Sequence, residues 1–209
     1  MLPREFFARN ALDVAPELLG CLLTSRSAQG AVTVRITEVE AYAGALDAAS
    51  HAYRGRTARN AVMFGPPGHA YVYFIYGMHF SVNVVCMPDG IAEAVLVRAG
   101  EVVDGHALAR SRRHASRSAD GADLARGPGR LASALGLGRA HDGADLCEPD
   151  GPLTLEAGKP VEGTLIRMGP RTGVSRAADL PWRFHLAGEA SVSPYRRAKA
   201  AGPVPEKAN

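Results

Sequence analysis

Two glutamates and a strand-like run of apolar residues are the first feature of this chain that points to chemistry. Glu38 and Glu40 stand two residues apart in ITEVEAY, directly after AVTVR. Because side chains alternate along a strand, we expect both carboxylates on the face of Val32, Val34 and Ile36. A carboxylate among apolar neighbours costs free energy unless it is paired or opens onto a cleft. One reason to keep it there is catalysis.

Arg98 is the expected partner of these carboxylates. It ends the apolar run AVLV and shares a strand face with Leu96, so it and Glu40 could project from neighbouring strands into one cleft. An adjacent guanidinium keeps a carboxylate ionised, as a general base must be at neutral pH. A structural ion pair at a sheet edge explains the spacing equally well. Alternation does not choose between Glu40 and Glu38.

A group of tyrosines could form a surface for stacking on a heteroaromatic base. Tyr71, Tyr73 and Tyr76 lie in one strand-like run, and Tyr42 and Tyr53 precede it. Tyrosine is common in strands, so the pattern alone favours a packed β-core. Tyr76 differs because it stands at the expected hairpin tip, where a ring would be exposed. A wedge that enters DNA would explain it.

Metal and phosphate motifs are weak in this chain. His51, His69 and His79 have no Cys or carboxylate at metal-ligand spacing, so we expect no metal site. The GPGR stretch lacks the Lys-Ser/Thr ending of a P-loop, although the helix it opens could offer N–H groups and Arg130 to a phosphate. An ordinary helix start is the simpler interpretation. No serine lies in a nucleophile motif.

The expected elements form a mostly antiparallel sheet. CLLTSR and AVTVRITEVE predict one hairpin, and YVYFIY and MHFSVNVV predict a second one that turns at Gly77. Further strands are expected at EAVLVRAGE, GPLTLEA, TLIRM and WRFHLAG, a long loop at 43–69, and a helix at GPGRLASALGL. The Arg-rich segment 106–126 is either a basic helix that frays at Gly121 or a partly disordered loop.

The whole chain has the composition of a soluble globular protein. Its 209 residues are 46% hydrophobic and 22% charged, and most of its basic residues are arginine, which permits nucleic acid as a partner. We expect one α+β domain over residues 1–197, with a curved, mostly antiparallel sheet, a protruding β-hairpin and peripheral helices, followed by a tail at 198–209. No run reaches membrane-spanning length and MLPREFFARN lacks a signal-peptide core, so cytoplasmic residence is expected.

One long segment resembles a known family. The run ITEVEAYAGALDAASHAYRGRTARNAVMFGPPGHAYVYFIYGMHFSVNVV closely resembles the 3-methyladenine DNA glycosylases of the alkyladenine, or methylpurine, type. GPGRLASALGL and PRTGVSRAADLPWRFHL resemble the family's later motifs, so the resemblance spans Arg4 to Val192. GEASVSPYRR departs from the Gly-Asn-Pro-aromatic pattern expected there, and we expect neither it nor segment 106–126 to touch the pocket.

The resemblance implies a reaction. A monofunctional glycosylase of base excision repair would flip a damaged purine out of double-stranded DNA and hydrolyse its N-glycosidic bond, leaving an abasic site. Glu40 would activate the water that attacks C1′, and Arg98 would order the charge and the backbone beside it. The expected substrates are 3-methyladenine, 7-methylguanine, hypoxanthine and ethenoadenine. No metal, redox cofactor or covalent lysine intermediate is expected, and the protein is expected to act at the nucleoid as a monomer.

The resemblance also implies which residues hold the flipped base. Tyr42, His51 and Tyr73 match the residues that enclose it, and backbone groups near Ala49 to His51 would read its edge. Asn83 matches the position whose amide obstructs the 2-amino group of normal guanine.

The resemblance assigns the contacts with the duplex to other residues. Tyr76 matches the wedge that enters the minor groove, with Met78 nearby. Together with Arg130, these are the DNA-binding candidates. Two alternatives stay open: a non-catalytic module that binds lesions or RNA, and a hydrolase of free nucleosides.

Overall fold

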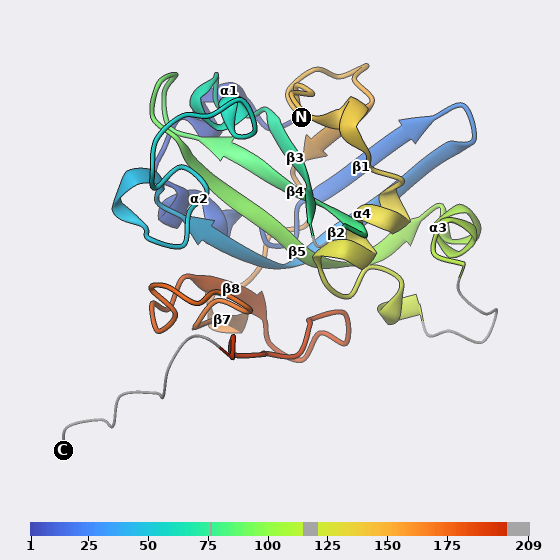
Figure 1. Cartoon of the computed structure of the whole chain (residues 1–209). Coiled ribbons are helices and arrows are strands. Elements are labelled where there is room, and N and C mark those ends of the chain that lie inside the picture. Colours follow the sequence, from blue (N-terminus) through green and yellow to red (C-terminus); the bar gives the residue numbers. More distant parts are fainter. Residues whose placement is uncertain (76, 115–120, 200–209) are drawn as a thin grey trace.

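A sheet of eight strands organises the chain in the computed structural model, which describes residues 1–75, 77–114 and 121–199 (Figure 1). Its continuous path runs β3-β4-β5-β2-β1-β6, and β8 joins β2 while β7 pairs with β8. All pairings between these strands are antiparallel. The strands are β1 Leu22–Ser27, β2 Gly30–Tyr42, β3 Ala70–Ile75, β4 His79–Cys86, β5 Glu93–Asp104, β6 Leu153–Glu156, β7 Ile166–Gly169 and β8 Arg183–Leu186.

Strand β2 is the central element and carries an irregularity that decides the site. Its first half pairs with β1 and its second half with β8, while β5 lies along its other edge. The register between β2 and β5 shifts on both sides of Glu38, so that Thr37 and Arg98 have no paired residue opposite them. Such a bulge advances the alternation of a strand by one residue. Beyond it Val39 and Ala41 enter the core.

The bulge corrects a prediction. Glu38 and Glu40 do not share the face of Ile36. They lie on the opposite side of β2, because Val39, between them, packs in the same core as Ile36. The expected strand is present, but simple alternation assigned its last five residues to the wrong faces.

The helices are short and lie around the sheet, as predicted. They are α1 Arg4–Phe7, α2 Ala11–Glu17, α3 His106–Arg112 and α4 Pro128–Leu135. Helix α4 begins with Pro at its first position and ends at Gly136, whose φ of 68° is the left-handed conformation of a helix C-cap. Its buried residues Leu131 and Leu135 each contribute about 1.5–3 kcal/mol by leaving water, which fixes α4 against β4 and β5.

The second predicted hairpin is confirmed. Strands β3 and β4 pair from Ala70 opposite Val84 to Ile75 opposite His79. Gly77 has a φ of 67°, which suits glycine in the turn. Met78 beside it is 70% exposed. Tyr76, predicted at this tip, lies outside the described residues.

The remaining segments are loops and 3-10 turns. The predicted long loop 43–69 holds η1 Gly44–Leu46 and η2 Ala61–Phe64, while η3 Gly121–Asp123, η4 Arg139–His141 and η5 Gly163–Leu165 lie in later connections. Residues 115–120, within segment 106–126, and residues 200–209, which make up most of the predicted tail, also lie outside the described part of the chain. The rest forms a single α+β domain. Its described helices include none long and apolar enough for a membrane span.

Candidate active site

A cavity of about 460 Å³ opens between the hairpin β3–β4, strand β5 and two loops. It brings together most of the predicted site residues from β2 to β5. Those in its wall are Tyr42, Ala49, His51, Tyr73, Asn83 and Arg98. The two loops contribute Ala48–His51 on one side and Thr172–Arg176 on the other. The size lies within the range of roughly 300–1,000 Å³ that is typical of small-molecule sites.

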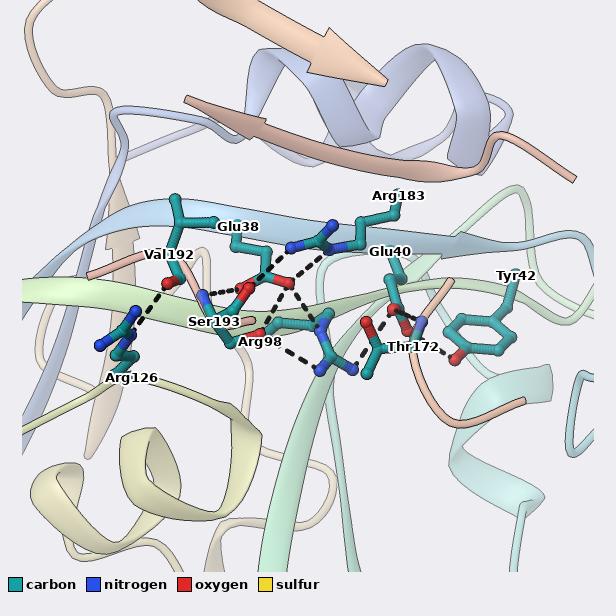
Figure 2. Close-up of polar contacts among 9 residues, drawn as sticks. All are labelled: Glu38, Glu40, Tyr42, Arg98, Arg126, Thr172, Arg183, Val192 and Ser193. Carbon is teal, nitrogen blue, oxygen red and sulfur yellow. Dashed lines mark hydrogen bonds and ion pairs between the residues drawn. The ribbon is translucent and has the colours of Figure 1, made fainter. Parts of the chain in front are cut away.

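Glu40 lies immediately behind this wall. Its side chain is fully buried, and three wall residues hold its carboxylate (Figure 2). The backbone N–H of Thr172 donates to Oε1 at 2.6 Å, and the Tyr42 hydroxyl donates to Oε2 at 2.9 Å. Nη1 of Arg98 lies 3.3 Å from Oε1. The predicted pairing of Glu40 with Arg98 is confirmed.

Opposite charges are buried together in the site and compensate one another. Burial alone would lower the pKa of Arg98, but Glu40 and Glu38 outweigh it, so that the pKa is raised and the guanidinium stays charged. Burial and the charge of Glu40 raise the pKa of Tyr42 well above its ordinary value. Tyr42 therefore keeps its proton and donates a hydrogen bond to the carboxylate.

Glu38 has a different environment from Glu40. Its buried carboxylate accepts from Nε of Arg98 at 2.9 Å, from Nε of Arg183 at 2.6 Å, and from the N–H and hydroxyl of Ser193 at 2.7 and 2.9 Å. These donors enclose it away from the cavity, and Figure 2 shows them around it. The geometry therefore favours Glu40 over Glu38 as the group that can act on a ligand.

The tyrosine cluster divides between core and pocket. Tyr71 is buried and Tyr73 half-buried, and their rings stack with centroids 5.1 Å apart. The His51 ring meets Tyr73 edge-on at 4.6 Å, and its Nδ1 lies 3.1 Å from the hydroxyl of Tyr71. Burial, with a smaller effect of Arg59, lowers the pKa of His51, so the neutral ring lines the pocket. Tyr71, Tyr73 and His51 thus form one aromatic wall.

Two further wall residues bear on what the pocket accepts. The Asn83 side chain donates through Nδ2 to the carbonyl of Tyr71 at 3.3 Å, which fixes the amide in the wall. The N–H of Ala49 donates to Asp47 at 3.0 Å, so this backbone donor is used within the protein. Reading of a ligand edge by this loop must rely on other groups.

The geometry suits a reaction in which a buried carboxylate accepts a proton beside a flat ligand. Comparisons with known proteins show the family. The sequence model of methylpurine-DNA glycosylases (MPG) matches residues 5–190. The chain belongs to this family. It is therefore a DNA glycosylase, an enzyme of DNA repair.

Bacterial relatives cover nearly the whole chain. A protein of Streptomyces avermitilis is 57% identical over 93% of this chain and 92% of its own, and one of Leifsonia xyli is 53% identical over 95% and 94%. A protein of Burkholderia lata is 48% identical over 92% and 91%. All three carry the name "Putative 3-methyladenine DNA glycosylase".

Two predicted DNA-binding residues of this glycosylase, Met78 and Arg130, lie outside the cavity wall. Met78 is at the hairpin tip, and Arg130 on α4 is 46% exposed and forms an ion pair with Asp123. Pro128, the first residue of α4, does line the cavity, so this helix connects the pocket with the surface that carries Arg130.

Sequence reasoning missed several residues of the glycosylase site. Thr172 and the fully buried Arg171 lie in a Pro/Gly loop with no periodicity that could mark them. Arg171 pairs with the equally buried Asp47 and stacks its guanidinium over the ring of Tyr42 at 4.6 Å. Their only mark in the sequence was an arginine between Pro170 and Gly173, within the family-like motif PRTGVSRAADLPWRFHL.

Ser193, which lies in the segment GEASVSPYRR, was also missed. GEASVSPYRR was expected not to touch the pocket, and it does not line the cavity. Ser193 nevertheless binds Glu38, and its hydroxyl accepts from Nη2 of Arg98 at 3.4 Å. The segment therefore reaches a residue of the pocket wall.

Among the described residues, no three His, Cys, Asp or Glu side chains gather in a way that could hold a metal ion. Cys21 and Cys86 are buried and Cys147 is partly exposed, and all three are free thiols.

Proposed function

We propose that this glycosylase removes alkylated or deaminated purines from double-stranded DNA by hydrolysis of the N-glycosidic bond. The substrates are 3-methyladenine, 7-methylguanine, hypoxanthine and ethenoadenine, and the product is an abasic site. The observation that carries the proposal is the placement of Glu40, whose carboxylate is held by Arg98, Tyr42 and Thr172 behind a purine-sized cavity. The names of the bacterial relatives support 3-methyladenine as one substrate.

In the proposed reaction, Glu40 takes a proton from water. The water oxygen forms a bond to C1′ while the bond from C1′ to the purine nitrogen breaks and leaves its electrons on the base. A base alkylated at a ring nitrogen already carries a positive charge and leaves as a neutral molecule, whereas hypoxanthine and ethenoadenine need a proton. Arg98 compensates the charge of Glu40 and of the DNA backbone. A positioned general base contributes on the order of 10²–10⁴-fold to such a step.

Binding of the flipped nucleotide is assigned to the aromatic wall. Extrusion costs a few kcal/mol, and least for damaged bases. Stacking on an aromatic side chain returns about 1–3 kcal/mol per base, so contacts with His51 and Tyr73 of this wall, together with the separate ring of Tyr42, nearly balance it. The amide of Asn83, fixed by the Tyr71 carbonyl, would meet the 2-amino group of normal guanine and exclude it.

The duplex is assigned to the surface that carries the hairpin tip and α4. Met78, two positions after the proposed wedge Tyr76 in the sequence, presents an exposed apolar side chain, and we propose that Arg130 contacts a phosphate. We propose that the enzyme acts on DNA at the nucleoid of the cytoplasm as a monomer, without metal or redox cofactor.

Single-turnover base release tests the proposal. Duplex oligonucleotides with one hypoxanthine or one ethenoadenine, and methylated DNA, are incubated with excess enzyme, and the released bases are identified. We expect release from duplexes and little from free 7-methylguanosine. Faster hydrolysis of the nucleoside than of the duplex would favour a nucleoside hydrolase, and tight lesion binding without any release would favour a non-catalytic module.

A further inference from the structure

The charged groups next to Glu40 form a closed arrangement with a second carboxylate at its centre. We propose that Glu38 is a positioning residue for the reaction: it holds the Nε side of Arg98, so that this guanidinium meets Glu40 through Nη1. The carboxylate of Glu40 then stays available to take a proton from water. The inference deepens the proposed function and rests on Glu40 being the base.

The three nitrogens of the Arg98 guanidinium are shared among different acceptors. Nε donates to Glu38 at 2.9 Å, and Nη2 donates to the hydroxyl of Ser193 at 3.4 Å. The shortest contact with Glu40 is from Nη1, at 3.3 Å. The Nε/Nη2 edge, which could bind a carboxylate through two parallel hydrogen bonds, is therefore occupied by Glu38 and Ser193. A two-bond pair with Arg98 is among the strongest contacts a carboxylate makes, and it would leave Glu40 a poorer base.

Glu38 is held firmly enough to do this. Arg183 on β8 and the Ser193 hydroxyl donate to Oε1 of Glu38, the oxygen that also accepts from Arg98, and the N–H of Ser193 donates to Oε2. Burial alone would raise the pKa of Glu38, but Arg98 and Arg183 outweigh it and hold the pKa below its ordinary value. Glu38 therefore stays negatively charged at neutral pH and keeps its hydrogen bond with Nε of Arg98.

The arrangement also balances charge around the base. Two carboxylates, Glu38 and Glu40, share the site with two guanidinium groups, Arg98 and Arg183. The charged and titratable groups packed around Glu40 come from every neighbouring element: Glu38 and Tyr42 on β2, Arg98 on β5, Arg183 and His185 on β8, and Arg171 paired with Asp47 from two loops. Removing the charge of Glu38 leaves an excess of positive charge, which makes Glu40 less basic.

The test is the pH dependence of single-turnover release of 7-methylguanine from a duplex. This base is positively charged in the DNA and leaves as a neutral molecule, so its departure needs no general acid. The acid limb of the profile therefore reports the general base alone. For Glu38→Gln we expect the acid limb to move to lower pH by about one unit, and the plateau rate to fall roughly tenfold because the base is weaker. A role in stability alone would lower the rate by one factor at all pH values and leave the limb in place.

In a second variant we expect the acid limb to move in the opposite direction. Arg183→Gln removes the cation that competes with Arg98 for Glu38, and it removes a positive charge near Glu40. Both effects move the acid limb to higher pH. Glu101→Gln is the matched control, because Glu101 on β5 forms an exposed ion pair with Arg35 on β2 at 2.8 Å, and its substitution should leave the profile unchanged.

The outcomes separate this inference from the proposed function. No release by the wild type, or full activity in Glu40→Gln, overturns the proposed function itself. If both behave as proposed, an unmoved acid limb in Glu38→Gln, or shifts of the same sign in Glu38→Gln and Arg183→Gln, overturns the positioning role. Should Glu38→Gln fail to fold, as judged by its melting transition, the Arg183→Gln profile decides, and a limb that stays in place or moves to lower pH contradicts the inference.

Discussion

Arg171 and Asp47 form an ion pair without exposed side-chain surface, and it ties together the two loops that close the pocket. Nη2 of Arg171 donates to Asp47 at 2.8 Å, and Nη1 donates to the carbonyl of Ala41 at 3.0 Å. The next residue, Thr172, donates its N–H to Glu40. The pair thus determines where this donor meets the carboxylate.

Asp47→Asn should destabilise the enzyme strongly. It leaves Arg171 buried with its charge uncompensated, which typically costs about 3–5 kcal/mol of unfolding free energy. Urea unfolding measures it. Glu17→Gln is the control, because Glu17 forms an exposed pair with Arg9 whose loss costs roughly 0–1 kcal/mol. Equal midpoints for the two variants would contradict the structural role of the buried pair.

Glu38 should make the stability of the protein dependent on pH in acid. Its pKa in the folded state is held below the ordinary value of 4.5, so its stabilising effect is complete above that pH and is lost as the pH falls through the folded value. Glu38→Gln has no such proton to bind. The difference in unfolding free energy between wild type and this variant should therefore shrink below about pH 4.5. Denaturant titrations at several pH values check it, and a difference independent of pH would show that the charge of Glu38 does not stabilise the fold.

Asn83→Ser should relax the exclusion of normal guanine. The amide that lines the cavity is removed, and the smaller side chain leaves room for the 2-amino group. We expect release of guanine from undamaged duplex to rise roughly tenfold relative to 7-methylguanine, the scale of a small steric change in a pocket. Ser81→Ala, another wall residue of β4, is the control and should not alter the ratio. An unchanged ratio in Asn83→Ser would remove Asn83 from the selection of the base.

DNA affinity should fall steeply with salt, because the expected phosphate contacts release counterions. For Arg130→Gln, the slope of log affinity against log salt concentration should decrease by about one. Asp123→Asn, which removes the ion-pair partner of Arg130, should tighten binding. Arg26→Gln on β1 is a control with similar exposure. Fluorescence anisotropy with an undamaged duplex gives the slopes, and identical slopes for Arg130→Gln and Arg26→Gln would count against a phosphate contact at α4.

Local patterns predicted the elements of this fold well. Two hairpins, strand β5 and helix α4 follow from period-two runs, a glycine turn, and a Pro start with a Gly end, all of which act within a few residues. The pairing of Glu40 with Arg98 was also foreseen, because both stand near the ends of apolar runs in strands that pair.

The faces of β2 and the roles of the loop residues were not predictable in the same way. A bulge at Thr37 shifts the alternation by one residue, and nothing in TEVEAY marks where two paired strands change register. Arg171 and Ser193 reach the site through contacts with residues more than a hundred positions away. Such contacts depend on how loops pack in three dimensions, and no periodicity records them.

Glu40 is proposed as the base that drives hydrolysis, and its substitution by glutamine is the decisive experiment. Single-turnover release of 7-methylguanine and hypoxanthine from duplex DNA is measured for wild type and Glu40→Gln, together with the affinity of each for the same duplexes. We expect rapid release by the wild type and a release rate lower by a factor on the order of 10²–10⁴ in Glu40→Gln, with DNA binding retained. Release by Glu40→Gln at the wild-type rate would contradict it.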